Sequence, residues 1–196
     1  MPALDHAHGT APDNDLDNDR DRDRDNDGDQ APAPALQLLR LDHAPALLAF
    51  EYENRAYFAV SVRDRGESYF ARFAERLGDL LTEQAAGLHY FHVLVSGDGT
   101  TADEVIGRVN LVDVADGSAE LGYRIAEKAA GKGLATEAVR EVCALAAETY
   151  GLTTLRAAAH HDNAASRAVL EHAGFTATGE SEIDGRPATH YIRTLS

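Results

Sequence analysis

The sequence predicts an α+β fold in which helices flank a mixed, mostly antiparallel sheet. Successive segments of alternating apolar residues, joined by short turn sequences, indicate antiparallel strands. A long helical segment then separates two strand segments, and such a crossover adds a further strand to the same sheet. The 196 residues are enough for one domain of about 150 residues with an appendage.

The appendage is an acidic low-complexity arm at the start of the chain. Every odd position from Asp13 to Asp29 is Asp, and residues 1–35 carry −7 of the net charge of −15. Because such a segment repels itself and has little apolar surface to bury, we expect residues 1–35 to be disordered and residues 36–196 to form the folded domain. Residues 23–28 copy the start of an EF-hand loop, but Pro34 stands where that loop needs its bidentate Glu. We therefore expect no specific metal site.

The composition also argues against several functions. The remaining charge of −8 on the folded part is unsuited to nucleic-acid binding, which needs clustered Lys and Arg. No apolar run approaches the roughly 18 residues of a membrane span, and the chain does not begin with a signal-peptide pattern, so we expect a cytoplasmic protein. Cys143, the single cysteine, lies among apolar residues of a predicted helix, which indicates a buried small side chain rather than a nucleophile.

The first elements of the folded part are a strand and two helices. Residues 36–41 are predicted as the strand, and Asp42 as the N-cap of a helix that ends near Glu53. The second helix is predicted from Asp64 to Ala86. Its apolar stripe has the spacing of a helix that packs on a core, with Tyr69, Phe70, Phe73, Leu77 and Leu80/Leu81.

Three strands follow in hairpin order, separated by turn residues. They are predicted at 89–96, 104–114 and 119–125, with turns at Gly97-Asp98-Gly99 and Asp116-Gly117. A loop rich in Gly and Lys then opens a helix from Leu134 that Gly151 ends. The predicted remainder is a strand at 155–160, a helix from Asp162 or Asn163 that Gly174 ends, and strands at 176–183 and 190–195 around an Asp184-Gly185 turn.

The succession of strand, glycine loop and helix predicts an anion site. Unpaired N–H groups and the positive end of a helix dipole converge there, and Gly131 and Gly133 let a ligand approach the backbone. The loop is not a Walker A loop, because Ala126 occupies the place of its first Gly. It is not a dinucleotide-binding fingerprint (G-x-G-x-x-G) either, since the third glycine of that pattern is missing after Gly131 and Gly133.

Two segments resemble the motifs of the GNAT N-acetyltransferases. Residues 128–133 (KAAGKG) are similar to motif A of that family, in which a loop between a bulged strand and a long helix holds the pyrophosphate of acetyl-CoA. Residues 163–175 (NAASRAVLEHAGF) are similar to motif B. Leu170 stands where many family members have a catalytic Tyr, and Ser166 occupies the position of a Ser in the ribosomal-protein N-terminal alanine/serine acetyltransferases. The resemblance therefore points to that subfamily, and it implies a GNAT-like sheet with splayed central strands.

The resemblance implies a set of site residues. For acetyl-CoA these are Tyr123, Arg124, Ile125, Lys128, Ala130, Gly131, Lys132, Gly133, Leu134, Ala135, Asn163 and Ser166. For the acceptor they are Arg55, Tyr57, Phe58 and Asn110. For catalysis they are Ser166 as proton donor to the departing thiolate, with Tyr191 as its alternative, and Glu120 as base through water, with Glu182 second. Backbone N–H groups of residues 123–125 would hold the thioester carbonyl.

The resulting hypothesis is direct transfer of an acetyl group from acetyl-CoA to a primary amine in a ternary complex, with a protein N-terminus as acceptor. One alternative acceptor is a small amine such as a polyamine, an amino acid or an antibiotic. A second alternative is a CoA-binding module without chemistry, for which the glycines and Asn163 would suffice. We expect no nucleic-acid or membrane partner, and a monomer or homodimer.

Overall fold

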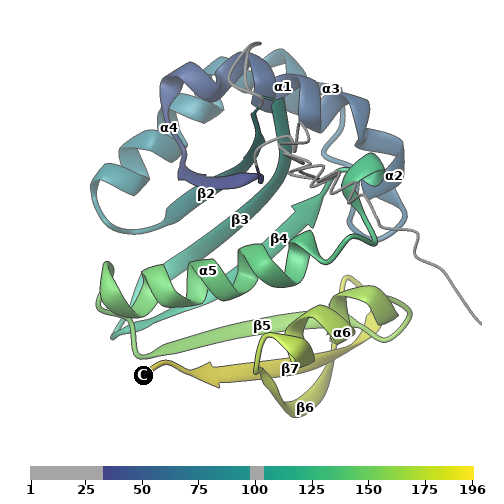
Figure 1. Cartoon of the computed structure of the whole chain (residues 1–196). Coiled ribbons are helices and arrows are strands. Elements are labelled where there is room, and N and C mark those ends of the chain that lie inside the picture. The colour runs from purple at the N-terminus through teal and green to yellow at the C-terminus, as the bar shows by residue number, and fades with distance from the viewer. Residues whose placement is uncertain (1–32, 98–103) are drawn as a thin grey trace, which may run out of the picture. The chain divides into compact units, whose positions relative to one another are not determined.

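The computed structural model describes residues 33–97 and 104–196. These residues form a seven-stranded sheet in the order β1-β2-β3-β4-β5-β7-β6 (Figure 1). All neighbouring strands are antiparallel except β4 and β5, which are parallel. The predicted mixed, mostly antiparallel α+β fold is confirmed. The predicted acidic arm and most of the predicted turn at residues 97–99 lie outside the described residues, so the boundary at residue 35 stays a prediction.

The elements follow the predicted order with some changes of extent. The strands are β1 (Ala35–Leu38), β2 (Tyr90–Ser96), β3 (Glu104–Ala115), β4 (Ser118–Ile125), β5 (Thr154–His160), β6 (Thr176–Ile183) and β7 (Arg186–Thr194). The α-helices are α1 (Ala44–Glu53), α2 (Arg55–Ala59), α3 (Glu67–Ala71), α4 (Phe73–Ala85), α5 (Leu134–Glu148) and α6 (Ala164–His172). Two 3-10 turns, η1 (Leu41–His43) and η2 (Glu127–Ala129), complete the set.

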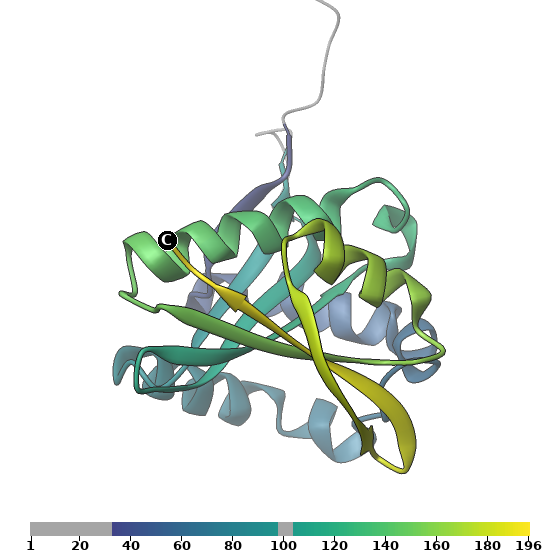
Figure 2. The ribbon, with the colours of Figure 1, turned by 90° about the horizontal axis from the view of Figure 1, so that it is seen from below.

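Helices cover both faces of the sheet (Figures 1 and 2). Helix α1 packs on β3 and α4 packs on β2. Helix α5 packs on β3 and β4, and α6 packs on β5. The layer under α5 is close-packed, because Val109 and Leu111 of β3 and Val139 and Val142 of α5 are fully buried. Cys143 is also buried in this layer, as predicted. The packing of α5 therefore fixes its N-terminus relative to β4.

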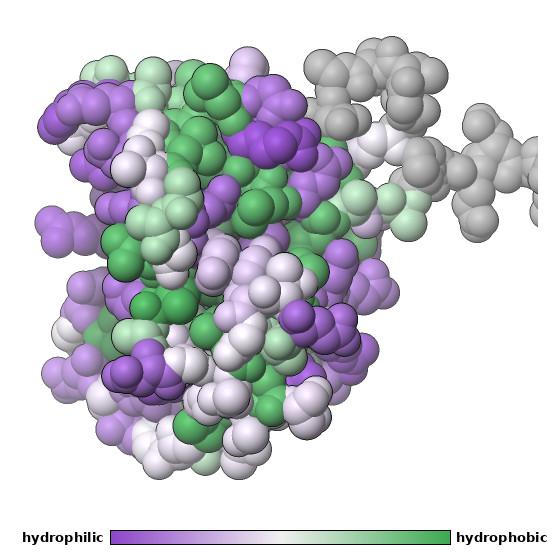
Figure 3. Space-filling model, turned by 90° about the vertical axis from the view of Figure 1, so that its left-hand side faces the viewer, coloured by the Kyte–Doolittle hydropathy of each residue, from purple (hydrophilic) through white to green (hydrophobic). Residues whose placement is uncertain are grey.

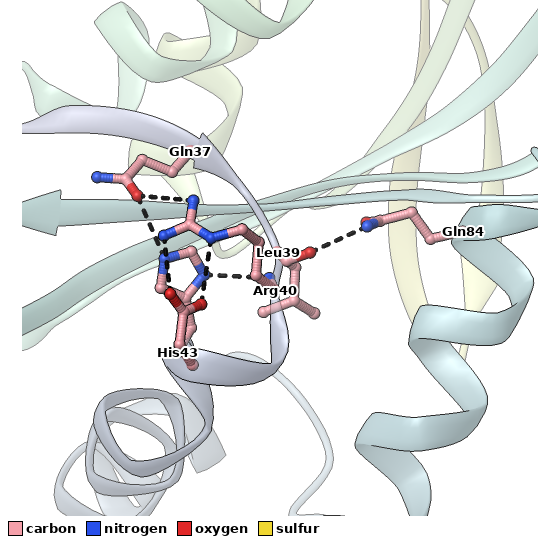
Figure 4. A network of polar contacts seen from close by, with 6 residues as sticks. Gln37, Leu39, Arg40, His43 and Gln84 are labelled. Carbon is pink, nitrogen blue, oxygen red and sulfur yellow. Dashed lines mark hydrogen bonds and ion pairs between the residues drawn. The ribbon is translucent and has the colours of Figure 1, made fainter.

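The start of the folded part differs from the prediction. Strand β1 ends at Leu38, and the chain then makes the turn η1 instead of entering a helix capped by Asp42 (Figure 4). The Asp42 carboxylate accepts hydrogen bonds from the Arg40 guanidinium, so it does not cap α1. His43 accepts from the Arg40 backbone N–H at 3.2 Å, and its other ring nitrogen contacts Gln37 at 3.2 Å.

The single helix predicted from Asp64 to Ala86 is also wrong. It consists of two helices, because the backbone at Arg72 (φ −109°, ψ 22°) leaves the helical region between α3 and α4. The apolar spacing continues across this break, so it gives no signal of it. The predicted core role of Tyr69, Phe73 and Leu77 is confirmed, since each is at most 7% exposed.

The central strands of the sheet separate beyond a short paired stretch. β4 and β5 pair only at Ser118–Thr154, Ala119–Leu155 and Glu120–Arg156. Beyond Glu120, β4 keeps its pairing with β3 up to Ile125 but has no strand partner on its other edge among residues 33–97 and 104–196. The register irregularity lies in β3, between Val112 and Ala115, so the expectation of a bulge in β4 after Glu120 is wrong. The expected splay of the central strands is present.

The molecular surface mixes apolar and charged residues, as the face in Figure 3 shows. Large exposed apolar side chains come from separate parts of the chain, such as Leu41 in η1, Val60 after α2 and Leu88 between α4 and β2. No helix among the described residues is long and apolar enough to cross a membrane.

Candidate active site

The glycine loop between β4 and α5 has the geometry of an anion cradle. Gly131 (φ 75°) and Gly133 (φ 81°) both adopt the left-handed backbone region, and Gly133 is the residue directly before α5. A Cβ on Gly131 would meet no atom within 4 Å, so the loop borders open space. The first turn of α5 directs backbone N–H groups toward this space, where the helix dipole favours negative charge.

A cavity of about 470 Å³ lies at this loop, and we call it the donor cavity. It is bounded by β4, the loop and the starts of α5 and α6, where β4 and β5 no longer pair. Most of the residues expected to bind acetyl-CoA line it: Tyr123, Arg124, Ile125, Ala130, Gly131, Gly133, Leu134, Ala135, Asn163 and Ser166. Two of the expected acceptor residues, Tyr57 and Phe58 of α2, line it as well. The fold thus brings together residues more than 100 positions apart.

Ser166 is held in the donor cavity by two contacts. The Asn163 side chain accepts a hydrogen bond from the Ser166 N–H at 3.0 Å, which caps α6 as predicted. The Tyr123 hydroxyl lies 2.9 Å from Ser166 Oγ and donates to the Ser166 carbonyl at 3.0 Å. Burial raises the pKa of Tyr123 to about 12, so this phenol stays protonated at neutral pH. Ser166 and Tyr123 therefore form a pair of neutral hydroxyls inside the cavity.

Four other predicted binding residues lie outside the donor cavity. Lys128 and Lys132 are exposed, and Lys128 forms an ion pair with Glu104. Arg55 pairs with Asp64 at 2.8 Å and with Glu67, and it lines a small neighbouring cavity. Asn110 lines a separate cavity on the other face of the sheet. Their roles stay predictions.

The predicted bases and the alternative acid do not line the donor cavity. Glu120 forms an ion pair with Arg156 at 2.9 Å at the last paired position of β4 and β5. Glu182 is exposed on the edge strand β6. Tyr191 of β7 is 3% exposed and belongs to the core. Of these three, Glu120 is nearest in the sheet to the β4 residues that line the donor cavity.

Some lining residues were not singled out from the sequence. They are Val60, Ser61, Val62, Ala129, Thr136, Ala165, Ala168, Val169 and His172. Val169 and His172 follow Ser166 at intervals of three, so helical spacing alone would place them on the face of Ser166. The segment 60–62 carries no such signal, because it reaches the cavity only through the packing of α2.

A buried charge cluster borders the donor cavity on the α1 side, and the sequence analysis did not predict it. Glu51 of α1 is 3% exposed and contacts Arg108 at 2.5 Å, Arg124 at 3.1 Å and Arg65 at 3.8 Å. Burial alone would raise the pKa of Glu51, but the three guanidinium groups hold it below its usual value. Arg124 also lies over the Phe58 ring, 5.0 Å from its centroid. We call Glu51, Arg65, Arg108 and Arg124 the arginine cluster.

The family follows from a comparison of sequences. The sequence model of the acetyltransferase (GNAT) domain matches residues 35–176 of this chain. The chain belongs to the GNAT acetyltransferase family. It is also 30% identical to the probable N-acetyltransferase YjcK of Bacillus subtilis (strain 168), over 72% of this chain and 79% of that protein. As a GNAT acetyltransferase it uses acetyl-CoA as donor and an amine as acceptor.

Solved structures of other GNAT acetyltransferases share the fold. The ribosomal-protein-S5-alanine acetyltransferase of Vibrio fischeri has a TM-score of 0.77 at 20% identity, covering 84% of this chain and 94% of that one. The spermidine N-acetyltransferase of Vibrio cholerae, in complex with CoA and spermine, has a TM-score of 0.68 at 16% identity, covering 83% and 95%. One of these two proteins is named for a protein acceptor and the other for a small amine.

Proposed function

We propose that this GNAT acetyltransferase acetylates a protein N-terminal α-amine by direct transfer in a ternary complex. The observation that carries the proposal is the Tyr123–Ser166 hydroxyl pair in the cavity of the glycine loop. The acceptor class is supported by the resemblance of motif B and by the S5-alanine acetyltransferase with the same fold. Membership of the ribosomal-protein N-terminal acetyltransferase subfamily and a protein α-amine as acceptor are therefore one proposal.

Each group has a role in this reaction. The N–H groups at the start of α5 bind the pyrophosphate, and the unpaired edge of β4 after Glu120 presents backbone groups to the thioester carbonyl. The amine attacks the carbonyl carbon, the C–S bond breaks, and the thiolate takes a proton from Ser166, which Tyr123 orients. Ser166 regains a proton from solvent as the products leave. The proton that the amine loses leaves through water to Glu120. No acyl-enzyme forms, so the buried Cys143 has no part in the reaction.

The donor site is tested by calorimetric titration with acetyl-CoA. Gly131→Asp places a carboxylate in the cradle, and Asp tolerates the left-handed region better than most residues. We expect it to weaken binding at least about tenfold through charge repulsion. Gly151→Asp is the matched control, because Gly151 has φ 66°, has open space around its Cβ position and lies beyond the other end of α5. Equal affinity in both variants would exclude this loop as the pyrophosphate site.

The acceptor is tested with three amines at equal concentration. These are a peptide with a free N-terminus and no Lys, an N-terminally blocked peptide that contains Lys, and spermidine. We expect mass spectrometry to find the acetyl group on the free N-terminus. Preference for spermidine would instead support the small-amine alternative, since a spermidine acetyltransferase has a similar fold.

Membership of the acetyltransferase family argues against the second alternative, a CoA-binding module without chemistry. Ser166→Ala and Glu120→Gln separate it from the enzyme, since a binder that lacks chemistry would lose nothing measurable from either substitution. An enzyme of the proposed kind would lose turnover while it keeps its affinity for acetyl-CoA.

A further inference from the structure

A second cavity of about 300 Å³ lies on the face of the sheet opposite α5, and we call it the distal cavity. Helices α3 and α4 form its walls with Tyr69, Phe73 and Arg76, and strands β2 and β3 form its floor with Phe91, Arg108 and Asn110. It shares no lining residue with the donor cavity. Its floor is polar, although it lies in the middle of a sheet.

The two cavities are connected through residues of the arginine cluster. A narrow cavity of about 20 Å³ shares Arg65 with the distal cavity and shares Phe58, Val62 and Arg124 with the donor cavity. Gly122 of β4 pairs with Asn110, and a Cβ at this glycine would meet no atom within 4 Å. The narrow cavity holds no more than about one water molecule, so an elongated molecule that reaches both larger cavities would cross β4 over the open space at Gly122.

The arginine cluster has an excess of positive charge. The Glu51 carboxylate compensates only one of the three guanidinium groups around it. Burial lowers the pKa of Arg124, and Arg65 and Arg108 lower it further by repulsion. Partly buried charge without a counterion is costly, so a second carboxylate at this place would be stabilised. Arg65 is accessible to it, with 33% of its side chain exposed.

Two buried polar atoms of the floor have no hydrogen-bond partner in the described part of the chain. They are Nε of Arg108, a donor, and Oδ1 of Asn110, an acceptor. The two residues are two positions apart on β3, so their side chains stand on the same face. A peptide group carries one donor and one acceptor and can satisfy both. Most buried polar groups have partners, so these two atoms are unusual. Each has less than 1 Å² of accessible surface, so a ligand reaches it only when its side chain turns toward the cavity.

The far wall of the distal cavity has the opposite sign. Asp79 and Glu83 of α4 line it together with Arg76, and Glu83 lies 3.7 Å from His89. The arginine-cluster side of the cavity is thus positive, whereas Arg76, Asp79 and Glu83 of α4 together carry one negative charge. In a chain of net charge −15, attraction of an anion here depends on these local arginines, because distant charges are screened.

We propose that the distal cavity binds the acceptor downstream of its amine, and that Arg65, Arg108 and Arg124 select acceptors with a carboxylate side chain close to that amine. This inference rests on the proposed function and narrows its substrate class to acidic N-terminal segments.

The probes are tetrapeptide amides with a free N-terminal Ser, otherwise Ala, and one Glu at position 2, 3 or 4. Each has a partner with Gln and a partner with Lys at the same position. At one position we expect kcat/KM for Glu to exceed that for Gln at least about tenfold, mainly through KM, because charge-assisted hydrogen bonds are the stronger ones. Equal values for Glu and Gln at all positions, or a preference for Lys, would overturn the proposal.

If the proposal holds, the preference for Glu over Gln peptides also depends on the arginine cluster. Arg65→Gln changes the accessible member of the cluster and should remove most of the advantage of Glu over Gln. Arg72→Gln is the matched control, because Arg72 lies at the α3–α4 junction, pairs with Glu75 and lines none of the three cavities. A loss of the preference in both variants would contradict selection by the cluster.

Calorimetry of the same peptides with the protein saturated with CoA separates this inference from the proposed function. Preferential binding of a Glu peptide without turnover would support the distal site and refute N-terminal acetylation. Turnover of peptides without a charge preference would support N-terminal acetylation and refute the distal site. Absence of any peptide binding at millimolar concentration would reject the distal site.

Discussion

At the residue scale, the catalytic role proposed for the Tyr123–Ser166 contact gives the most direct prediction. Ser166→Ala should lower kcat about 10- to 100-fold with little effect on acetyl-CoA affinity, and Tyr123→Phe about tenfold. If Tyr123 acts only through Ser166, the double variant will be no slower than Ser166→Ala alone. Steady-state kinetics of the four proteins measures this coupling. Fully additive effects would show that Tyr123 acts on its own.

His92 makes the stability of the fold depend on pH. Its ring is 1% exposed, it contacts the Val109 carbonyl at 3.2 Å and the Tyr150 hydroxyl at 2.8 Å, and burial lowers its pKa from 6.5 to about 4. Between pH 4 and pH 6.5, His92 is protonated in the unfolded chain but neutral in the folded protein. The free energy of unfolding therefore has its full value above pH 6.5 and falls as the pH drops toward 4. Between pH 7 and pH 5 the loss should be roughly 2 kcal/mol.

Urea unfolding of the protein and of His92→Gln at pH 5, 6 and 7 checks this dependence. The variant should be less stable at pH 7 but should lose less stability on acidification. His190→Gln is the control, since His190 is exposed on β7. An equal pH slope in the protein and in His92→Gln would assign the dependence to other groups.

At the element scale, Asn163 caps helix α6 and also lines the donor cavity, so we expect it to affect both stability and acetyl-CoA binding. Asn163→Ala removes the acceptor for the Ser166 N–H and should destabilise the fold by about 1 kcal/mol. Asn163→Asp keeps the cap and should preserve stability, but its charge in the donor cavity should weaken acetyl-CoA binding. Unfolding and calorimetry on both variants measure the two effects separately. Parallel loss of stability and binding in both would show that Asn163 acts only as a cap.

The elements also show where sequence patterns stop being informative. Alternating apolar residues predict the strand β4. Glycine before its first turn marks the start of α5, and an N-cap side chain marks the start of α6. The break at Arg72 is not marked, because the apolar stripe runs through it, and η1 replaces the predicted cap because Asp42 binds Arg40 instead.

At the scale of the whole molecule, the acidic arm is predicted to be dispensable for the fold and for acetyl transfer. Every described helix and strand begins at or after Ala35, so deletion of residues 1–34 removes none of them. We expect the unfolding midpoint to be unchanged and kcat/KM to change less than about twofold near physiological salt, where exposed charges are screened. A larger change in kcat/KM for acidic or basic peptides would show that the arm influences acceptor choice.

The sequence by itself determined the α+β class, the succession of most strands and helices along the chain, the glycine loop and the capped helix of motif B. All of these depend on interactions within a few residues, and a local pattern reports them. Only the tertiary structure decided which residues meet. Tyr123 contacts Ser166 across 43 positions, Glu51 reaches Arg124 across 73, and β4 parts from β5 after three pairs. These contacts depend on how the helices pack against a splayed sheet, and no local pattern encodes that packing.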